Sequence, residues 1–217
     1  MLYIVATPIG NLKDITLRAL ETLKEVDLIL AEDTRVTRKL LSHFEIEKEI
    51  ISYHQHSKSN KIDYILKLLK EGKNLALVSD SGTPGISDPG NKLIEEAVKE
   101  GVEVSPIPGP SALASIISVA GFGTDRFLFL GFIPPKNKRN KFLEKVVNSE
   151  YPVVFYESCH KILKTLEDLK NLSSDLDVVV GRELTKKFET ICRGKIEEVL
   201  EEVKNFPIKG EFAIIIK

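Results

Sequence analysis

Three short loops rich in glycine and proline are the segments of this sequence best suited to chemistry. They lie at residues 6–11, 79–90 and 107–111, and each follows a short apolar run. If those runs are parallel strands, the loops meet at one edge of a sheet, where open α/β folds bind ligands. The third loop leads into a helix at Ser111, and exposed amides at a helix start favour an anionic or hydrogen-bond-accepting group. The sequence therefore predicts a ligand site at this edge.

The loops do not carry the common nucleotide-binding signatures. The first has a single glycine, Gly10, where the dinucleotide fingerprint needs three. No stretch of the chain has the P-loop spacing G-x-x-x-x-G-K-[ST]. These observations disfavour a standard nicotinamide or flavin site and exclude a nucleoside triphosphate site of the P-loop kind.

Several carboxylates could gather at the same edge. Glu32 and Asp33 end the second apolar run, and Asp80 lies in the second loop. They could bind Mg²⁺ for phosphoryl chemistry, but helix capping and turn formation explain such aspartates without a ligand. His54 and His56 would share one face of a strand, but they lack the third ligand that a zinc site needs. We therefore expect no bound metal.

Alternating strand-length and helix-period segments position these residues. In the first half we expect strands at 2–6, 27–31, 50–53, 74–79 and 102–105, and helices at 16–26, 35–44, 59–71, 89–100 and 111–120. Asp88 is the expected N-cap of the fourth of these helices, with Pro89 as its first residue and Gly101 just past its end. The pattern is that of successive βα units.

A glycine-rich segment at 121–125 interrupts the pattern and is the predicted linker. Beyond it we expect strands at 126–132, 152–156, 177–181, 188–192 and 211–217, and helices at 139–149, 160–169 and 196–203. The second half has more strand per helix than the first. The sequence thus predicts two α/β domains, residues 1–120 with a mostly parallel sheet and 121–217 with a mixed sheet, and a cleft between them.

Composition sets broad limits on the kind of protein. The chain has 217 residues, 42% of them hydrophobic and 29% charged, which is typical of globular proteins. No apolar run approaches the ~18 residues that would span a bilayer. We expect a cytoplasmic protein without a membrane partner.

A cluster of basic residues raises the question of a nucleic-acid partner. The densest basic stretch without an acid runs from Lys136 to Lys141. It is either a solvated loop that enters a helix or a surface for phosphates. The net charge of −1 does not decide between them, because nucleic-acid binding needs only a local basic surface.

Motifs spread along the chain resemble one known family. They lie at 3–16, 31–35, 78–84, 108–112, 155–158, 182–186 and 210–211, and include Ala31-Glu32-Asp33-Thr34-Arg35, Pro108-Gly109-Pro110-Ser111-Ala112 and Arg182-Glu183-Leu184-Thr185-Lys186. The chain resembles the tetrapyrrole methylase superfamily, and within it the members that methylate small-subunit ribosomal RNA. The match covers residues 2–216 in order.

This resemblance implies a fold, a cofactor and a reaction. The fold is that of class III S-adenosylmethionine (SAM)-dependent methyltransferases, with SAM in the cleft between two α/β domains. The reaction is methyl transfer to the ribose 2′-oxygen of a cytidine in the decoding region of 16S rRNA, as free RNA or in the small ribosomal subunit. It also implies a homodimer. Longer relatives continue past the last strand into a helical extension, whereas this chain stops at Lys217.

The resemblance also implies which residues contact SAM. In the N-terminal half they are Pro8, Ile9, Gly10, Ser81, Gly82, Thr83, Ile86, Ser111 and Ala112, and in the C-terminal half Glu157, Leu184 and Ala213. Ser81 stands where relatives usually have alanine. The three loops that the residue pattern marks as a ligand edge are then the SAM loops.

Methyl transfer to a hydroxyl needs a group that removes or orients a proton. Asp33, Glu183 and Lys186 are our candidates, because they follow strands and would face the predicted cleft. The candidates for phosphate contacts are Arg35, Arg38, Lys136, Lys138, Arg139 and Lys141. A cytidine turned out of its stack would enter the site, with Tyr53 or Tyr156 available to stack on it.

Three other functions stay open from the sequence. One is a methyltransferase of the same superfamily that acts on a tetrapyrrole or another small acceptor. A second is a non-catalytic ribosome- or RNA-binding protein that keeps the fold. A third is a Mg²⁺-dependent nucleotide hydrolase that uses the carboxylates around Asp33 and Asp80.

Overall fold

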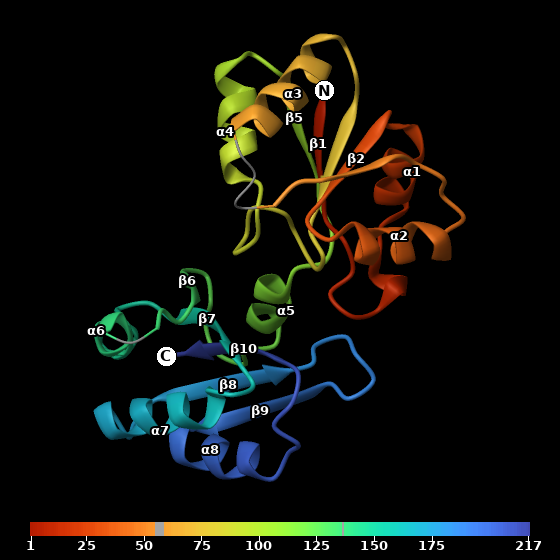
Figure 1. The fold of residues 1–217 in the computed structure, drawn as a ribbon. Coiled ribbons are helices and arrows are strands. Elements are labelled where there is room, and N and C mark those ends of the chain that lie inside the picture. Colours follow the sequence, from red (N-terminus) through yellow and green to blue (C-terminus); the bar gives the residue numbers. More distant parts are fainter. Residues whose placement is uncertain (55–58, 136) are drawn as a thin grey trace. The chain divides into compact units, whose positions relative to one another are not determined.

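The computed structural model describes residues 1–54, 59–135 and 137–217. The chain divides into two compact units, Met1–Ser111 and Ala112–Lys217, which are described separately (Figure 1). The division falls before helix α5 (Ala112–Ser118) and not at the glycine-rich segment after residue 120. The reason is that α5 packs against strands of the second unit.

The first unit is a parallel sheet with helices on both faces, as the sequence predicts. Its strands are β1 (Leu2–Val5), β2 (Leu28–Ala31), β3 (Ile50–Ser52), β4 (Leu75–Val78) and β5 (Val104–Ile107), in the order β3-β2-β4-β1-β5. Its helices are α1 (Leu17–Glu25), α2 (Thr34–His43), α3 (Ser59–Lys70), α4 (Asn91–Lys99) and the short 3₁₀ helix η1 (Leu12–Asp14). Every neighbouring strand pair in this sheet is parallel.

Alternation along the strands builds the two cores of this unit. Leu75 and Leu77 of β4 pack with α3 and α4, whereas Ala76 and Val78 pack with α1 and α2. Successive strand residues point to opposite faces, so a strand buried on both faces is apolar throughout. Figure 1 shows the two helix pairs on opposite sides of the sheet. The arrangement leaves the strand ends and their loops free for a site.

In this unit, one helix and one strand have boundaries two residues from the predicted ones. Helix α4 begins at Asn91 and not at Pro89, because Gly90 is its N-cap with a φ of 146° that favours glycine. Strand β5 lies two residues later than predicted and includes Pro106. Proline is tolerated there because β5 is an edge strand that pairs only with β1. Gly101 ends α4 in the left-handed region, with a φ of 71°, as predicted.

The second unit is a mixed sheet, again as predicted. Its strands are β6 (Leu128–Phe132), β7 (Val153–Ser158), β8 (Asp177–Arg182), β9 (Thr190–Lys195) and β10 (Glu211–Ile216), in the order β6-β7-β10-β8-β9. Helices α6 (Asn137–Val147), α7 (Ile162–Leu172) and α8 (Ile196–Lys204) accompany them. Only β6 and β7 are parallel, and the other pairs are antiparallel. The strand predicted at 126–132 begins at Leu128, and the segments predicted at 139–149, 160–169 and 188–192 are likewise shifted by two or three residues, to Asn137–Val147, Ile162–Leu172 and Thr190–Lys195.

One face of this sheet carries the main core of the second unit. Helices α6, α7 and α8 pack there around Phe155 and Ile214. Helix α5 contacts β10, β7 and β8, and Figure 1 shows it on the face opposite α7 and α8. Among the helices of the described residues, none is long and apolar enough to cross a membrane.

Candidate active site

The three glycine- and proline-rich loops of the first unit do lie at one edge of the sheet. They follow β1, β4 and β5, which are parallel neighbours. Thr7 and Gly82 exchange two backbone hydrogen bonds, with N···O distances of 2.9 and 3.0 Å, and so join the first loop to the second. Thr83 Oγ1 donates to the carbonyl oxygen of Pro110 at 3.2 Å and joins the second loop to the third. The predicted convergence is confirmed.

Glycine at two positions lets these loops approach closely. Gly82 has a φ of +81°, and a Cβ there would lie 3.4 Å from Cγ2 of Ile9. A Cβ on Gly109 would lie 3.1 Å from Cβ of Ala6. A larger residue would therefore be strained by the φ of position 82 and would crowd Ala6 from position 109.

Side-chain hydroxyls hold the second loop in shape from within. Thr7 Oγ1 donates to the carbonyl oxygen of Ser79 at 3.0 Å. Ser79 Oγ donates to the carbonyl oxygens of Ser81 and Gly82, at 3.2 Å each. Thr7 and Ser79 are buried, and their hydroxyls are satisfied by the loop itself. The loop is thus held in this conformation by its own hydrogen bonds.

The residues that the resemblance assigns to SAM fall on these loops in the first unit. Ile9 and Gly82 are buried, Gly10 is exposed, and Pro8, Ser81, Thr83, Ile86 and Ser111 are half-buried. Their placement agrees with a ligand edge. Their contacts with SAM stay predictions.

Asp33 is held by its neighbours and is poorly suited to act as a base. It is the N-cap of α2 and accepts a hydrogen bond from the Arg35 amide at 2.8 Å. The Arg35 side chain also donates to both of its oxygens, and its Nη2 lies 2.6 Å from Oδ2. These hydrogen bonds lower the pKa of Asp33 to about 2. A carboxylate with so low a pKa is a weak base, so the structure argues against the predicted role.

Glu32, the residue before it, is the better candidate. Partial burial and the nearby negative charges of Asp80 and Asp33 raise the pKa of Glu32, while His54 opposes them. The backbone amide of Asp33 donates to Oδ1 of Asp80 at 3.0 Å, which ties the ends of β2 and β4 together. The sequence shows two adjacent acids after β2. Only the tertiary structure shows that Glu32 is the stronger base and that Asp33 is the helix cap.

Lys186 is a bound cation and not a base. Its Nζ lies 2.9 Å from Oε1 of Glu183 and 2.9 Å from Oε2 of Glu211. Partial burial alone would lower the pKa of Lys186, but these carboxylates outweigh it and raise the pKa. Lys186 is therefore protonated at neutral pH and cannot accept a proton. The sequence predicts Lys186 as a base or an orienting group, and its ion pairs favour the orienting role.

Glu183 is part of the ion-pair cluster that Lys186 forms with Glu183 and Glu211. Partial burial acts to raise the pKa of Glu183, but Lys186 and the amide of Glu211 outweigh it and lower the pKa. Glu183 Oε1 accepts from that amide at 3.0 Å. Its side chain thus joins the loop after β8 to the start of β10, which is a positioning role.

The second unit brings the remaining predicted SAM residues near helix α5. Ala112 begins α5, which packs against β10, the strand that contains Ala213, and against β8. A Cβ on Gly181 would lie 2.8 Å from Cδ1 of Ile116 and 2.9 Å from Cδ2 of Leu184. Glycine at 181 therefore leaves room for α5 and the loop after β8 to pack on the same strand.

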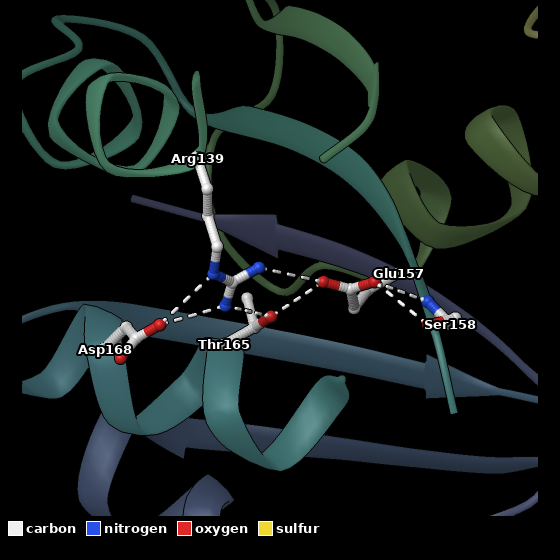
Figure 2. Close-up of polar contacts among 5 residues, drawn as sticks. All are labelled: Arg139, Glu157, Ser158, Thr165 and Asp168. Atoms are coloured by element: carbon white, nitrogen blue, oxygen red, sulfur yellow. Dashed lines mark hydrogen bonds and ion pairs between the residues drawn. The ribbon is translucent and has the colours of Figure 1, made fainter. Parts of the chain in front are cut away.

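A buried ion-pair network in the second unit involves two predicted site residues (Figure 2). The Arg139 side chain is 12% exposed, and its Nη2 lies 3.0 Å from Oδ2 of Asp168 and 2.9 Å from Oγ1 of Thr165. Its Nη1 lies 3.4 Å from Oε2 of Glu157. Glu157 also accepts from Thr165 Oγ1 at 2.7 Å and from the Ser158 amide at 2.7 Å. The network links α6 to β7 and α7.

This network changes two expectations. The guanidinium of Arg139 is already bound inside the protein, which disfavours its prediction as a phosphate contact. The Glu157 side chain is 4% exposed and fully occupied by partners. A contact between SAM and Glu157 would have to use the backbone. Buried charges of this kind need such partners because removal from water is costly.

The other basic candidates are exposed. Arg38, Lys138 and Lys141 lie on the surface of α2 and α6. The Arg35 side chain is 82% exposed despite its ion pair with Asp33. Lys136 lies outside the described residues. These four described side chains stay candidates for phosphate contacts.

The two tyrosines predicted to stack on the cytidine are not well exposed in the structure. Tyr53 is 3% exposed within the core beside α3, so the expectation that it stacks on a base is wrong. Tyr156 is half-buried and packs edge-on against Phe129 and Phe132. The sequence analysis missed Phe188, which is 66% exposed in the loop after β8, with Nζ of Lys187 5.5 Å from the centre of its ring. The sequence feature that could have indicated its exposure is that Phe188 lies between charged residues.

Within the described part of the chain, no three His, Cys, Asp or Glu side chains are grouped so that they could hold a metal ion. Within the first unit, the candidate site therefore consists of three joined loops at one edge of the sheet and Glu32, a carboxylate with a raised pKa. Such an arrangement suits a small organic ligand held by hydrogen bonds.

Comparison with known proteins decides the family. A family model described as Tetrapyrrole (Corrin/Porphyrin) Methylases matches residues 1–200. Ribosomal RNA small subunit methyltransferase I of Thermotoga maritima is 46% identical over 215 residues, which cover 99% of this chain and 97% of the relative. This chain belongs to the ribosomal RNA small subunit methyltransferase I family of tetrapyrrole methylases. The protein of that name from Escherichia coli O157:H7 is 46% identical over 220 residues, which cover 100% of this chain and 77% of the relative.

Two solved structures share the fold. The cobalt precorrin-4 methyltransferase CbiF matches with a TM-score of 0.70 and 19% identity, over 99% of this chain and 93% of the solved chain. Diphthine synthase matches with a TM-score of 0.76 and 15% identity, over 99% and 89%. At these identities the likeness shows the fold alone. This member of the ribosomal RNA small subunit methyltransferase I family is thus a methyltransferase with the α/β fold that the sequence predicts.

Proposed function

We propose that this chain uses SAM to methylate small-subunit ribosomal RNA, at the ribose 2′-oxygen of a cytidine in the decoding region of 16S rRNA. Relatives named ribosomal RNA small subunit methyltransferase I align with 99% to 100% of the chain, which supports this acceptor class. The observation that carries the cofactor proposal is the loop edge of the first unit. There the Thr7–Gly82 backbone pair joins two of the predicted SAM loops.

The residues of the first unit fit SAM. Three loops meet at one edge of its sheet, and glycine at positions 82 and 109 lets them approach closely. Bound SAM supplies a methyl group on a positively charged sulfur and needs no metal ion. The proposed contacts are those that the resemblance assigns, with Glu157 acting through its backbone.

Glu32 is the proposed acceptor of the hydroxyl proton. Burial and the negative charge of Asp80 raise the pKa of Glu32, so it is a stronger base than an ordinary carboxylate. Asp33 and Lys186 hold neighbouring segments in place instead. A general base typically contributes about 10²- to 10⁴-fold, and positioning of the reactants supplies ~7–11 kcal/mol of the barrier.

Exposed cations are proposed to contact the RNA backbone. Arg35 and Arg38 lie on α2, which begins directly after the two acids at the end of β2. Lys138 and Lys141 lie on α6. Contacts with phosphates orient the RNA but do not read its sequence. The cytidine itself would have to leave its stack to react.

Mapping of methyl groups on the RNA tests this function. Small-subunit RNA is isolated from cells with and without the protein and analysed by mass spectrometry. We expect loss of one 2′-O-methyl group from a cytidine of the decoding region when the protein is absent. An unchanged map would overturn the RNA assignment and leave a small-acceptor methyltransferase or a non-catalytic RNA-binding protein. Magnesium-dependent nucleotide turnover would instead indicate a hydrolase.

The oligomeric state and the cellular location are proposed from the family resemblance as well. We expect a homodimer in the cytoplasm, where ribosomal subunits are found. Light scattering should give twice the chain mass of 24.3 kDa. A single-chain mass at micromolar concentration would contradict the dimer.

A further inference from the structure

The loop between β8 and β9, residues 183–189, has an unusual backbone. Glu183 and Thr185 have φ values of 51° and 67°, in the left-handed region. Threonine is β-branched and rarely adopts this conformation, because its Cβ substituents crowd the backbone. Glycine or asparagine would fit there at lower cost. Strain of this kind persists where surrounding contacts enforce it, and such sites are often functional.

Polar contacts around the loop enforce this conformation. The buried Arg182 donates from Nε to the carbonyl oxygen of Lys209 at 2.9 Å and from Nη1 to that of Phe188 at 3.3 Å. The amide of Thr185 donates to Oε2 of Glu189 at 2.6 Å. Lys186 binds Glu183 at the other side of the loop. Thr185 is therefore held in place and cannot relax to an ordinary φ.

The hydroxyl of Thr185 is buried without a hydrogen-bond partner. Among the residues that the structure describes, its Oγ1 is the one buried side-chain oxygen or nitrogen in this state. Buried polar groups in folded proteins are nearly always paired, because an unpaired one loses its hydrogen bonds with water. A strained backbone and an unpaired hydroxyl thus coincide at one residue of an otherwise well-bonded loop.

We propose that the Thr185 hydroxyl is a cofactor-binding group that hydrogen bonds with SAM. The residue before it, Leu184, is a predicted SAM contact and lies with Ile116 of α5 against Gly181, which pairs with Ala213, another predicted SAM contact. SAM carries hydroxyl, amino and carboxylate groups, each of which can form a hydrogen bond with a threonine hydroxyl. A buried hydroxyl suits a small ligand better than the surface of an RNA strand. The inference rests on the proposed function, in which SAM is the cofactor.

Thr185→Val separates binding from folding, because valine keeps the shape and branching of threonine and removes only the hydroxyl. If the hydroxyl has no partner in the free protein, the melting temperature of the variant without SAM should stay the same or rise. Its dissociation constant for SAM, measured by calorimetry, should increase about tenfold. Thr185→Ser keeps a hydroxyl and should bind SAM within about threefold of the original protein. If Thr185→Val does not fold, Thr185→Ala takes its place with the same expectations.

Thr190→Val is the matched control. Thr190 Oγ1 has a partner, the carbonyl oxygen of Phe188 at 3.3 Å. This variant should melt at a lower temperature and keep its affinity for SAM.

Each other outcome has a definite meaning. A lower melting temperature of Thr185→Val with unchanged SAM affinity would overturn the proposal, because the hydroxyl would then have a partner within the protein. A higher melting temperature with unchanged affinity would overturn it in favour of a buried water or no partner. Weakened RNA binding with normal SAM binding would assign the hydroxyl to RNA. Failure of the unmodified protein to bind SAM would refute the proposed function itself, before any variant is compared.

Discussion

Thr7 and Gly82 exchange two backbone hydrogen bonds, at 2.9 and 3.0 Å, although they belong to loops after different strands. The pair makes one surface of two predicted SAM loops, and Gly82 sits in it with a φ of +81°. We predict that Gly82→Val abolishes SAM binding in calorimetry, because the larger side chain would press on Ile9 and strain the joined loops. The strain should also cost about 1–3 kcal/mol of stability.

Gly72→Val is the control for that strain. Gly72 has a similar φ of +87°, but nothing lies within 4 Å of a Cβ placed there. The control should lose similar stability and keep its SAM affinity. Full affinity in Gly82→Val would show that this loop is not part of the site.

The second prediction concerns the titration of Asp33. Its folded-state pKa of about 2 lies below the ordinary aspartate value of about 3.9. The ionised carboxylate therefore favours the folded state above about pH 4, and this contribution is lost as the pH falls toward 2. Carboxyl ¹³C NMR should show titration near pH 2, and Arg35→Ala should move it upward. A normal pKa in the unmodified protein would restore Asp33 as a base candidate.

The third prediction concerns Glu32. Glu32→Gln should lower the rate of methyl transfer by about 10²- to 10⁴-fold and leave the dissociation constant for SAM unchanged. The acid side of the pH–rate profile should reflect a pKa above the ordinary glutamate value, because partial burial and Asp80 raise it. Asp33→Asn is the comparison variant, since asparagine still caps a helix. A larger rate loss in Asp33→Asn than in Glu32→Gln would reverse the two roles.

The fourth prediction tests the RNA contacts on α6. The double variant Lys138→Ala, Lys141→Ala should bind RNA more weakly, and the slope of log K against log salt should fall by about 0.7–0.9 per lost contact. Affinity for SAM should not change. Filter binding at several salt concentrations measures the slope. An unaltered slope would make this stretch an ordinary solvated surface.

The fifth prediction concerns Arg139, which lies in the same basic stretch. Arg139→Ala should lower the free energy of unfolding by about 3 kcal/mol, because it leaves Glu157 buried without its cation. Lys138→Ala, next to it but exposed, should stay within about 0.5 kcal/mol of the original protein. Urea denaturation followed by circular dichroism compares the two. Equal stabilities would mean that the network contributes nothing.

Local sequence patterns determined most of the architecture. Period-two and helical spacings are properties of short segments, so each strand and helix could be recognised before any packing was known. The predictions failed where local backbone geometry or packing against other elements sets the boundary of an element or a unit. Gly90 replaces Asp88 as the cap of α4 because the chain turns there with a φ of 146°. Helix α5 joins the second unit because it packs on β10, β7 and β8.

The ligand edge was also predictable, because parallel strands bring their following loops to the same side of a sheet. The roles of individual charged residues were not. Glu32 and Asp33 are adjacent acids in the sequence, yet a hydrogen-bonded arginine makes one a weak base, and burial beside Asp80 makes the other a stronger one.

The basic stretch on α6 shows the same limit. Successive residues of a helix are about 100° apart, so neighbours in the sequence face different surroundings. Lys138 and Lys141 are exposed, whereas Arg139 points toward α7 and β7 and binds Asp168 and Glu157. Composition alone makes these three cations equivalent. The tertiary structure decides which of them can contact RNA, because the packing of α6 buries Arg139 against Asp168 and Glu157 and leaves the two lysines exposed.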